Sequence, residues 1–248
     1  QTIRSVLDQD YPNLEYWVID GGSTDGSLEI IQKYAGQLAG WVSEPDRGQA
    51  DGINKGLARA TGEVVAWLNS DDLYYPGAVQ AAVAALAANP QASFVFSDVE
   101  SIDEAGLPFH RIHYGHWGLA DLMRFRIIGQ PAVFMRHRFL AQTGLLDPSY
   151  HYLLDHHLWL RLGLHAPFGY VPGVCWAAAR FHPGAKNVAQ AAAFGAEAYR
   201  IVDWMEAAPE FLGQPLLRQI GDVRCHPGNG QSGIGRRPAD EGVLAGQQ

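Results

Sequence analysis

Two short acidic turns, each directly after an apolar run, constrain this chain more than any other feature. Residues 16–19 precede the turn at 20–26, and residues 64–68 precede the turn at 69–72. Short apolar runs bounded by Gly and Asp are typical of strands buried in a parallel sheet. In such sheets, ligands bind just beyond the carboxyl ends of the strands. The two turns together therefore predict an α/β fold with an acidic ligand site at that edge of the sheet.

The charge balance limits the partners of this chain. Its 248 residues carry a formal net charge of −8 at pH 7. A general nucleic-acid binder needs an excess of Lys and Arg to neutralise phosphates, so we expect no nucleic-acid partner. A single nucleotide remains compatible with an acidic protein, because a bound cation can bridge carboxylates and phosphates.

Cysteine usage and hydropathy indicate the compartment. Only Cys175 and Cys225 occur, which argues against a disulfide scaffold and favours a reducing compartment such as the cytoplasm. The longest apolar candidate, residues 78–88, is shorter than a membrane span. The sequence therefore predicts a cytoplasmic protein.

Helical and extended patterns alternate along most of the chain. Beyond the two apolar runs, the sequence predicts strands over residues 41–43, 93–98 and 133–135. It predicts helices over residues 2–9, 27–34, 48–59, 76–89, 155–164 and 188–205. This alternation favours βαβ units with right-handed crossovers, and hence a mostly parallel sheet flanked by helices.

Two stretches lack such a pattern. Residues 100–118 show no clear period, which predicts loops. Residues 206–248 are rich in Gly and Pro, and no aromatic residue occurs from Leu212 onward. Such a composition buries little surface, so we expect one domain over residues 1–205 followed by a disordered tail over 206–248.

A series of short motifs carries a likeness to a known family. In chain order they are QDYPNLE at 9–15, IDGGSTDGS at 19–27, SEPDRG at 43–48, NKG at 54–56, ATGE at 60–63, NSDD at 69–72, GQPA at 129–132, the segment 155–162, and RFHP at 180–183. The sequence resembles family-2 glycosyltransferases with the GT-A fold, a Rossmann-like α/β fold, and above all bacterial members that build cell-surface polysaccharides. The likeness covers roughly residues 1–205, and the order of the motifs makes it more specific than any single motif.

The sequence departs from this family in three places. Relatives open with a strand ahead of the helix that begins here at residue 2, so the resemblance implies an N-terminally truncated domain that lacks its first strand. Asn69 stands where many relatives have Asp, and His157 stands where many have a second acidic residue.

The resemblance implies a donor site at the first turn and at the start of the helix over 48–59. Asp20 would accept hydrogen bonds from the base or ribose of a nucleotide, and Gly21 lets the backbone approach a ligand. Asp46 and Arg47 lie where helix amides favour anions, and Arg47 would contact phosphate or sugar. Ordinary turn and helix-capping roles explain each of these residues as well.

The second turn is the candidate metal site. Mg²⁺ and Mn²⁺ prefer oxygen ligands, commonly one or two carboxylates together with substrate phosphates. By resemblance, Asp71 is the direct ligand of Mn²⁺ or Mg²⁺, and Asn69 and Asp72 support it or hold waters. The alternative is an N-cap cluster for the helix that starts near Pro76.

The resemblance also implies a general base and a further contact to the donor. Asp155 occupies the position of the base that removes a proton from the acceptor hydroxyl, and the helix dipole would keep its carboxylate ionised. Helix capping is again the alternative. His156 and His157 are expected to be packed or solvated rather than catalytic. His182 would touch the diphosphate or the metal, unless it is an ordinary surface histidine.

These features predict a metal-dependent glycosyltransferase that acts in surface polysaccharide biosynthesis. The resemblance implies that it transfers a sugar from a nucleotide-diphosphate sugar to an acceptor hydroxyl, with inversion. The expected acceptor is a saccharide or a lipid-linked saccharide, with peripheral association at the inner face of the plasma membrane. The alternatives are a non-catalytic domain that binds sugar nucleotides or glycans, and a sugar nucleotidyltransferase; the latter would need a Gly-rich loop after the first strand.

Overall fold

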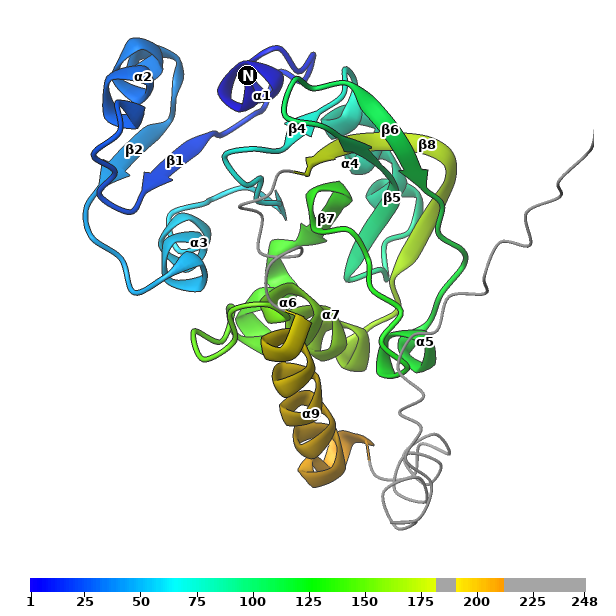
Figure 1. Ribbon diagram of the computed structural model, residues 1–248. Helices are drawn as coiled ribbons and strands as arrows, with labels where there is room; N and C mark the ends of the chain where they lie inside the picture. The colour runs from blue at the N-terminus through cyan, green and yellow to red at the C-terminus, as the bar shows by residue number, and fades with distance from the viewer. Residues whose placement is uncertain (182–190, 212–248) are drawn as a thin grey trace, which may run out of the picture.

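The computed structural model describes residues 1–181 and 191–211 of the chain. A six-stranded sheet with helices on both faces forms its larger part, and a two-stranded sheet forms a smaller unit beside it. In Figure 1, β1 and β2 with helix α2 stand apart from the larger sheet, at the left of the view.

The elements follow the expected alternation in the first half of the chain. The helices are α1 (Thr2–Leu7), α2 (Ser27–Tyr34), η1 (Ala35–Gln37), α3 (Gln49–Leu57), α4 (Ala78–Ala88), α5 (Leu119–Met123), η2 (Gln130–Ala132), α6 (His137–Thr143), α7 (Leu154–His165), α9 (Ala191–Ala207) and η3 (Pro209–Phe211). The strands are β1 (Trp17–Asp20), β2 (Gly40–Ser43), β3 (Val64–Val65), β4 (Leu73–Tyr74), β5 (Phe94–Ile102), β6 (Pro108–Ile112), β7 (Val133–Arg136) and β8 (Gly169–Arg180). All six predicted helices are present, with ends that shift by a few residues.

The larger sheet is mixed, so the prediction of a mostly parallel sheet is wrong. Its strands run in the order β3-β7-β5-β8-β4, with β6 paired to β5. Only β5 and β8 are parallel neighbours among these strands; the pairs β3–β7, β5–β7, β4–β8 and β5–β6 are antiparallel. Antiparallel neighbours need no helical crossover, so an alternation of helices and strands does not determine the direction of every strand.

Side chains alternate across β5 and build a core on each face of this sheet. Phe94 and Phe96 face α5, α6, α7 and α9, where the fully buried Trp159 lies at the centre of one cluster. Val95 and Val99 point the other way, toward α4. This alternation is the period-two pattern of a strand that is covered on both faces.

The smaller sheet consists of β1 and β2 in parallel, with Asp20 opposite Ser43 at its carboxyl end. A Cβ atom on Gly40 would lie 2.2 Å from the Trp17 ring, so the ring packs directly onto the glycine backbone. Helix α3 packs against β1 and continues the chain toward β3 in the larger sheet. The two acidic turns therefore follow strands of different sheets.

Three strands, β4, β6 and β8, escaped the sequence prediction. The prediction of loops over 100–118 is wrong, because β5 continues to Ile102 and turns back into β6. Strand β8 was not predicted, because Pro172 and Gly173 interrupt it. Both lie in the irregular stretch between the Phe96–Tyr170 and Asp98–Cys175 pairs, where the register shifts. Such a bulge accommodates a proline and a left-handed glycine within a strand.

The C-terminal part of the described structure packs onto the core. Helix α9 runs to Ala207, and Phe211 in η3 is fully buried. Residues 212–248 lie outside the described residues, so the expected disorder of the tail stays a prediction, as does the missing first strand. No helix in the described part of the chain is long and apolar enough to cross a membrane.

Candidate active site

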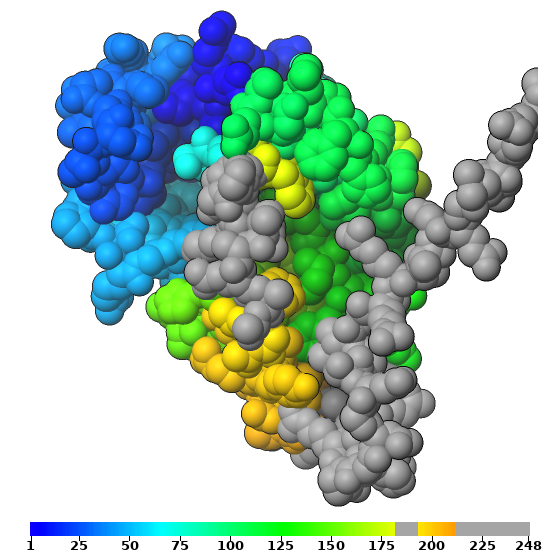
Figure 2. Space-filling model, in the orientation of Figure 1, coloured from blue at the N-terminus to red at the C-terminus, as the bar shows by residue number. Residues whose placement is uncertain are grey.

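A cleft of about 1820 Å³ is lined by residues of both sheets. Figure 2 shows the blue and cyan N-terminal part and the green part of the larger sheet as neighbouring lobes. Seven of the nine predicted site residues line this cleft: Asp20, Gly21, Asp46, Asn69, Asp71, Asp72 and Asp155. The fold therefore brings together carboxylates that are as much as 135 positions apart in the sequence.

Asp20 closes the first turn with its own side chain. Its Oδ2 atom accepts hydrogen bonds from the Gly22 amide at 3.1 Å, the Ser23 amide at 3.1 Å and the Ser43 hydroxyl at 2.6 Å. Burial works to raise the pKa of Asp20, but these hydrogen bonds outweigh it and hold the pKa below its ordinary value. The carboxylate is thus held ionised at the carboxyl end of β1.

Asp46 lies directly against this turn. A Cβ atom on Gly21 would be 2.5 Å from the Asp46 Oδ2 atom, so a larger residue at position 21 would displace that carboxylate. The other oxygen, Oδ1, accepts the Gly48 amide at 2.8 Å. The resemblance assigned both positions to the donor site, and the structure places them in contact.

Arg47 lies outside the cleft. Its side chain is 82% exposed, and it donates from Nη2 to the Asp51 Oδ1 atom at 3.0 Å. This is an ordinary i,i+4 surface pair. A contact from Arg47 to a donor phosphate stays a prediction.

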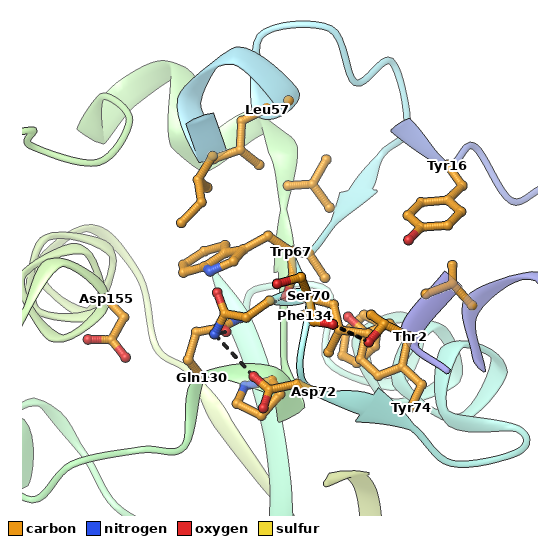
Figure 3. Close-up of a pocket in the computed structure, with 18 of the residues that line it drawn as sticks. Thr2, Tyr16, Leu57, Trp67, Ser70, Asp72, Tyr74, Gln130, Phe134 and Asp155 are labelled. Carbon is orange, nitrogen blue, oxygen red and sulfur yellow. Dashed lines mark hydrogen bonds between the residues drawn. The ribbon is translucent and has the colours of Figure 1, made fainter. Parts of the chain in front are cut away.

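Asn69 sits at the centre of an amide network in the second turn. Its Oδ1 atom accepts a hydrogen bond from the side-chain Nε2 atom of Gln49 at 2.9 Å. Its Nδ2 atom donates to Asp72 Oδ2 at 3.1 Å and to Gln130 Oε1 at 3.2 Å. Gln130 in turn donates to the Trp67 carbonyl at 2.7 Å. Figure 3 shows Trp67, Asp72 and Gln130 of this network converging from separate segments of the chain. Both polar atoms of Asn69 are engaged, so Asn69 braces the turn in this structure.

Asp72 is buried behind the turn and is tied to β8. Its Oδ1 atom accepts the Arg180 amide at 3.0 Å, and the Arg180 side chain donates from Nε to the Asp71 carbonyl at 3.0 Å. Burial raises the pKa of Asp72 to about 6, and the charge of Asp71 adds to the rise; the bonds from Arg180 and Asn69 oppose it. Asp72 therefore stabilises the turn through hydrogen bonds. Of the two carboxylates, Asp71 is the one better placed to bind a ligand.

The residues present fit a cation that is held largely by substrate phosphates. Among the described residues, no group of three or more His, Cys, Asp or Glu side chains is arranged to hold a metal ion alone. Mg²⁺ and Mn²⁺ sites that use one or two carboxylates plus phosphates and waters need no such cluster. Asp71, which lines the cleft on a turn fixed by Arg180, matches that donor set.

Asp155 stands in the first turn of α7, and in Figure 3 it lies to the left of Gln130 in the pocket. Burial raises its pKa to about 6, and the nearby charge of Glu197 adds to the rise. The backbone bonds of His156 and of Asp155 itself oppose it. The helix dipole was expected to favour the ionised carboxylate, but burial has the larger effect on its pKa. A base with a pKa just below neutrality is ionised at pH 7 and still takes up a proton readily.

The two histidines after Asp155 are packed, as the sequence predicted. His156 is fully buried and shares a hydrogen bond of 3.0 Å with the Leu122 carbonyl. His157 is buried between the rings of Tyr150 and Trp204. Burial lowers the pKa of His156 to about 4 and that of His157 to about 3, so both are neutral at pH 7.

Some functional candidates were found only in the structure. Gln49, Gln130 and Arg180 hold the second turn, although only the GQPA and RFHP motifs hinted that two of them matter. No local pattern linked them to residues 69–72, because each is distant in sequence. His182 lies outside the described residues, so its contact with diphosphate or metal stays a prediction.

Comparison with known proteins identifies the family of this chain. The model of the family named "Glycosyl transferase family 2" matches residues 1–146, more than half of the sequence. The chain belongs to that family.

Curated family members align over much of this chain. A glycosyltransferase of Rickettsia conorii with no characterised function is 26% identical over 203 residues, which cover 76% of this chain and 33% of that protein. TuaG of Bacillus subtilis, whose name assigns it to teichuronic acid biosynthesis, is 29% identical over 167 residues, 65% of each chain. The sequence spans a third or less of the length of the first curated relatives that it matches, at 33%, 33% and 26%.

Solved structures share the fold of this family-2 member. Staphylococcus aureus TarS (residues 1–349) in complex with UDP superposes with a TM-score of 0.64 at 20% identity, covering 84% of this chain and 61% of TarS. The mannosyltransferase PcManGT of Pyrobaculum calidifontis, solved with GDP-Man and Mn²⁺, gives a TM-score of 0.57 at 19% identity, covering 90% and 65%. At these identities the likeness shows the fold.

Proposed function

We propose that this family-2 domain transfers a sugar from a nucleotide-diphosphate sugar to an acceptor hydroxyl, with inversion and with a divalent cation. One observation carries the proposal: five aspartates, at positions 20, 46, 71, 72 and 155, line a single cleft. A doubly charged diphosphate in such surroundings is repelled unless a cation lies between them. The PcManGT structure, which holds GDP-Man together with Mn²⁺, agrees with that requirement.

The proposed reaction divides the work between the two sides of the cleft. Asp20, at the carboxyl end of β1, and Asp46, just beyond the end of β2, face the nucleoside, and Asp71 faces the cation and the diphosphate. The cation, when bound, offsets the charge that develops on the leaving diphosphate. Asp155 removes the proton of the acceptor hydroxyl, which attacks the anomeric carbon from the side opposite the diphosphate and so inverts the configuration there.

The acceptor is proposed from the relatives rather than from the cleft. TuaG carries a name from teichuronic acid biosynthesis. We therefore propose that the acceptor is a saccharide, free or lipid-linked, of a surface polysaccharide.

A thermal-shift screen tests the binding half of this proposal. Nucleoside diphosphates and their sugars, at 100-fold above Kd, should stabilise the protein by about 2.7 kcal/mol, which raises Tm by roughly 5 to 10 °C for a domain of this size. The shift should require Mn²⁺ or Mg²⁺. A shift of equal size in EDTA would contradict the role of the cation.

Product analysis tests the chemical half. Release of nucleoside diphosphate from a donor sugar, followed with and without Mn²⁺, separates an enzyme from a binding domain, because a binding domain shifts Tm and releases nothing. Retention of the donor's anomeric configuration in the product would contradict inversion.

A further inference from the structure

The segment that leads into α7 is held by a buried glutamate from α9. Glu197 is 6% exposed. Its Oε1 atom accepts the His151 amide at 2.6 Å, and its Oε2 atom accepts the Tyr152 and Leu153 amides, each at 2.8 Å. One carboxylate thus takes three consecutive backbone N–H groups, and hydrogen bonds to a charged acceptor are the stronger kind.

A second residue of α9 holds the same segment one step earlier. Arg200 donates to the Ser149 carbonyl at 2.9 Å and to the Ser149 hydroxyl at 2.8 Å, and its guanidinium lies 4.4 Å from the centre of the Tyr150 ring. Helix α9 is itself fixed in the core by Ile201 and Met205, which are fully buried. Each of residues 149–153 therefore contacts Glu197 or Arg200, which belong to a helix that is packed into the core; we call residues 149–153 the clamped segment.

The clamped segment determines where Asp155 lies. Leu153 is the N-cap residue of α7, and its carbonyl accepts the His157 amide at 2.9 Å, so its position sets the start of the helix. Residues 151–155 all line the cleft. A displacement of Leu153 would move Asp155 with it, and a shift of about 1 Å in a reacting group can cost about 100-fold in rate.

We propose that Glu197 is a positioning residue for Asp155: by binding the amides of residues 151–153, it fixes the start of α7 and so aims the Asp155 carboxylate into the cleft. This inference rests on the proposed function, in which Asp155 is the base. A carboxylate is needed at position 197 because each of its two oxygens must accept at once. The amide of a glutamine has one acceptor and would turn an N–H donor toward backbone N–H groups.

The test compares Glu197→Gln with Glu206→Gln, which changes an exposed glutamate on the same helix. Donor turnover with Mn²⁺ and donor affinity are measured for both variants, and amide hydrogen exchange reports on residues 151–153. We expect Glu197→Gln to lower kcat by about 10- to 100-fold, to leave donor Kd within about twofold, and to speed exchange at these three amides by at least about tenfold. Glu206→Gln should match the wild type in all three measurements.

The possible results separate this inference from the proposed function. A wild-type protein that releases no nucleoside diphosphate from any donor defeats the proposed function, and the positioning role falls with it. An active wild type with unchanged kcat in Glu197→Gln defeats the positioning role alone. Equal losses of kcat and donor affinity would also overturn it, because they indicate a general loss of structure.

A milder variant keeps the test decisive if Glu197→Gln does not fold. Arg200→Lys keeps the charge but loses the paired bonds to Ser149. It should lower kcat by about two- to fivefold without weakening donor binding. In that case, an unchanged kcat in Arg200→Lys would overturn the proposal.

Discussion

Replacing Asp155 by Asn should stabilise the protein at neutral pH while it removes the proposed base. The ordinary pKa of an aspartate is 3.8, and burial raises the pKa of Asp155 to about 6. The folded protein therefore holds the proton of this carboxyl more tightly than the unfolded chain does. Asn keeps the shape of the side chain and its acceptor for the His156 amide, but it cannot ionise.

The sign and the size of the effect follow from this shift in pKa. Below pH 3.8 the carboxyl is protonated in both states, and the wild type bears no penalty from ionisation. As the pH rises from about 4 to 6, the unfolded chain releases the proton first, so the free energy of unfolding of the wild type falls. Above pH 6 the penalty is complete, at about 2 to 3 kcal/mol for a shift of this size. Asp155→Asn should avoid it.

Urea unfolding at pH 4 and at pH 8 measures this difference. We expect Asp155→Asn to match the wild type at pH 4 and to exceed its free energy of unfolding by about 2 to 3 kcal/mol at pH 8. Asp147→Asn is the matched control with the opposite sign. Burial acts to raise the pKa of Asp147, but hydrogen bonds from Ser149 outweigh it and lower the pKa. Asp147→Asn should therefore lose stability at pH 8. A pH-independent difference, or a less stable Asp155→Asn at pH 8, would show that burial does not raise the pKa of Asp155.

Three further predictions concern the cleft. Donor turnover should fall as the pH drops through about 6, because burial raises the pKa of Asp155 and protonation removes the base; a pH profile that is flat from 5 to 8 would contradict this. Asp71→Ala should abolish the cation dependence of nucleoside-diphosphate binding in titration calorimetry and leave the circular dichroism spectrum unchanged, whereas Asp10→Ala, an exposed acid, should alter neither measurement. Arg180→Leu should weaken cation-dependent binding by several-fold, because its Nε atom holds the Asp71 carbonyl; unchanged affinity would show that the turn holds its shape unaided.

The sequence predicted those parts of the fold that depend on local patterns. Helices α2 and α7 have apolar residues at helical spacing, and the run before Asp20 is a strand. The direction of β7 and the existence of β8 depend on pairing between distant segments, and no local period records that. A Pro and a Gly inside a strand read as a loop until the bulge that accommodates them is seen.

The candidate site could likewise be predicted only in part from the sequence. The aspartates could be named from the sequence because they lie in turns after strand-like runs or at the start of a helix, and because these positions match motifs of the family. Their electrostatic states could not, because burial depends on what packs around each carboxylate; it raises the pKa of Asp155 despite the helix N-terminus. Glu197 had no local signal, since its partners lie more than 40 residues earlier in the chain.

The central claim is that Asp155 is the base of a cation-dependent sugar transfer. Its most direct test is turnover and donor affinity measured side by side in Asp155→Asn. We expect a loss of turnover on the order of 10²- to 10⁴-fold with donor Kd nearly unchanged, because the base faces the acceptor rather than the nucleotide. Near-normal turnover in this variant would exclude Asp155 as the base and leave it as a helix cap.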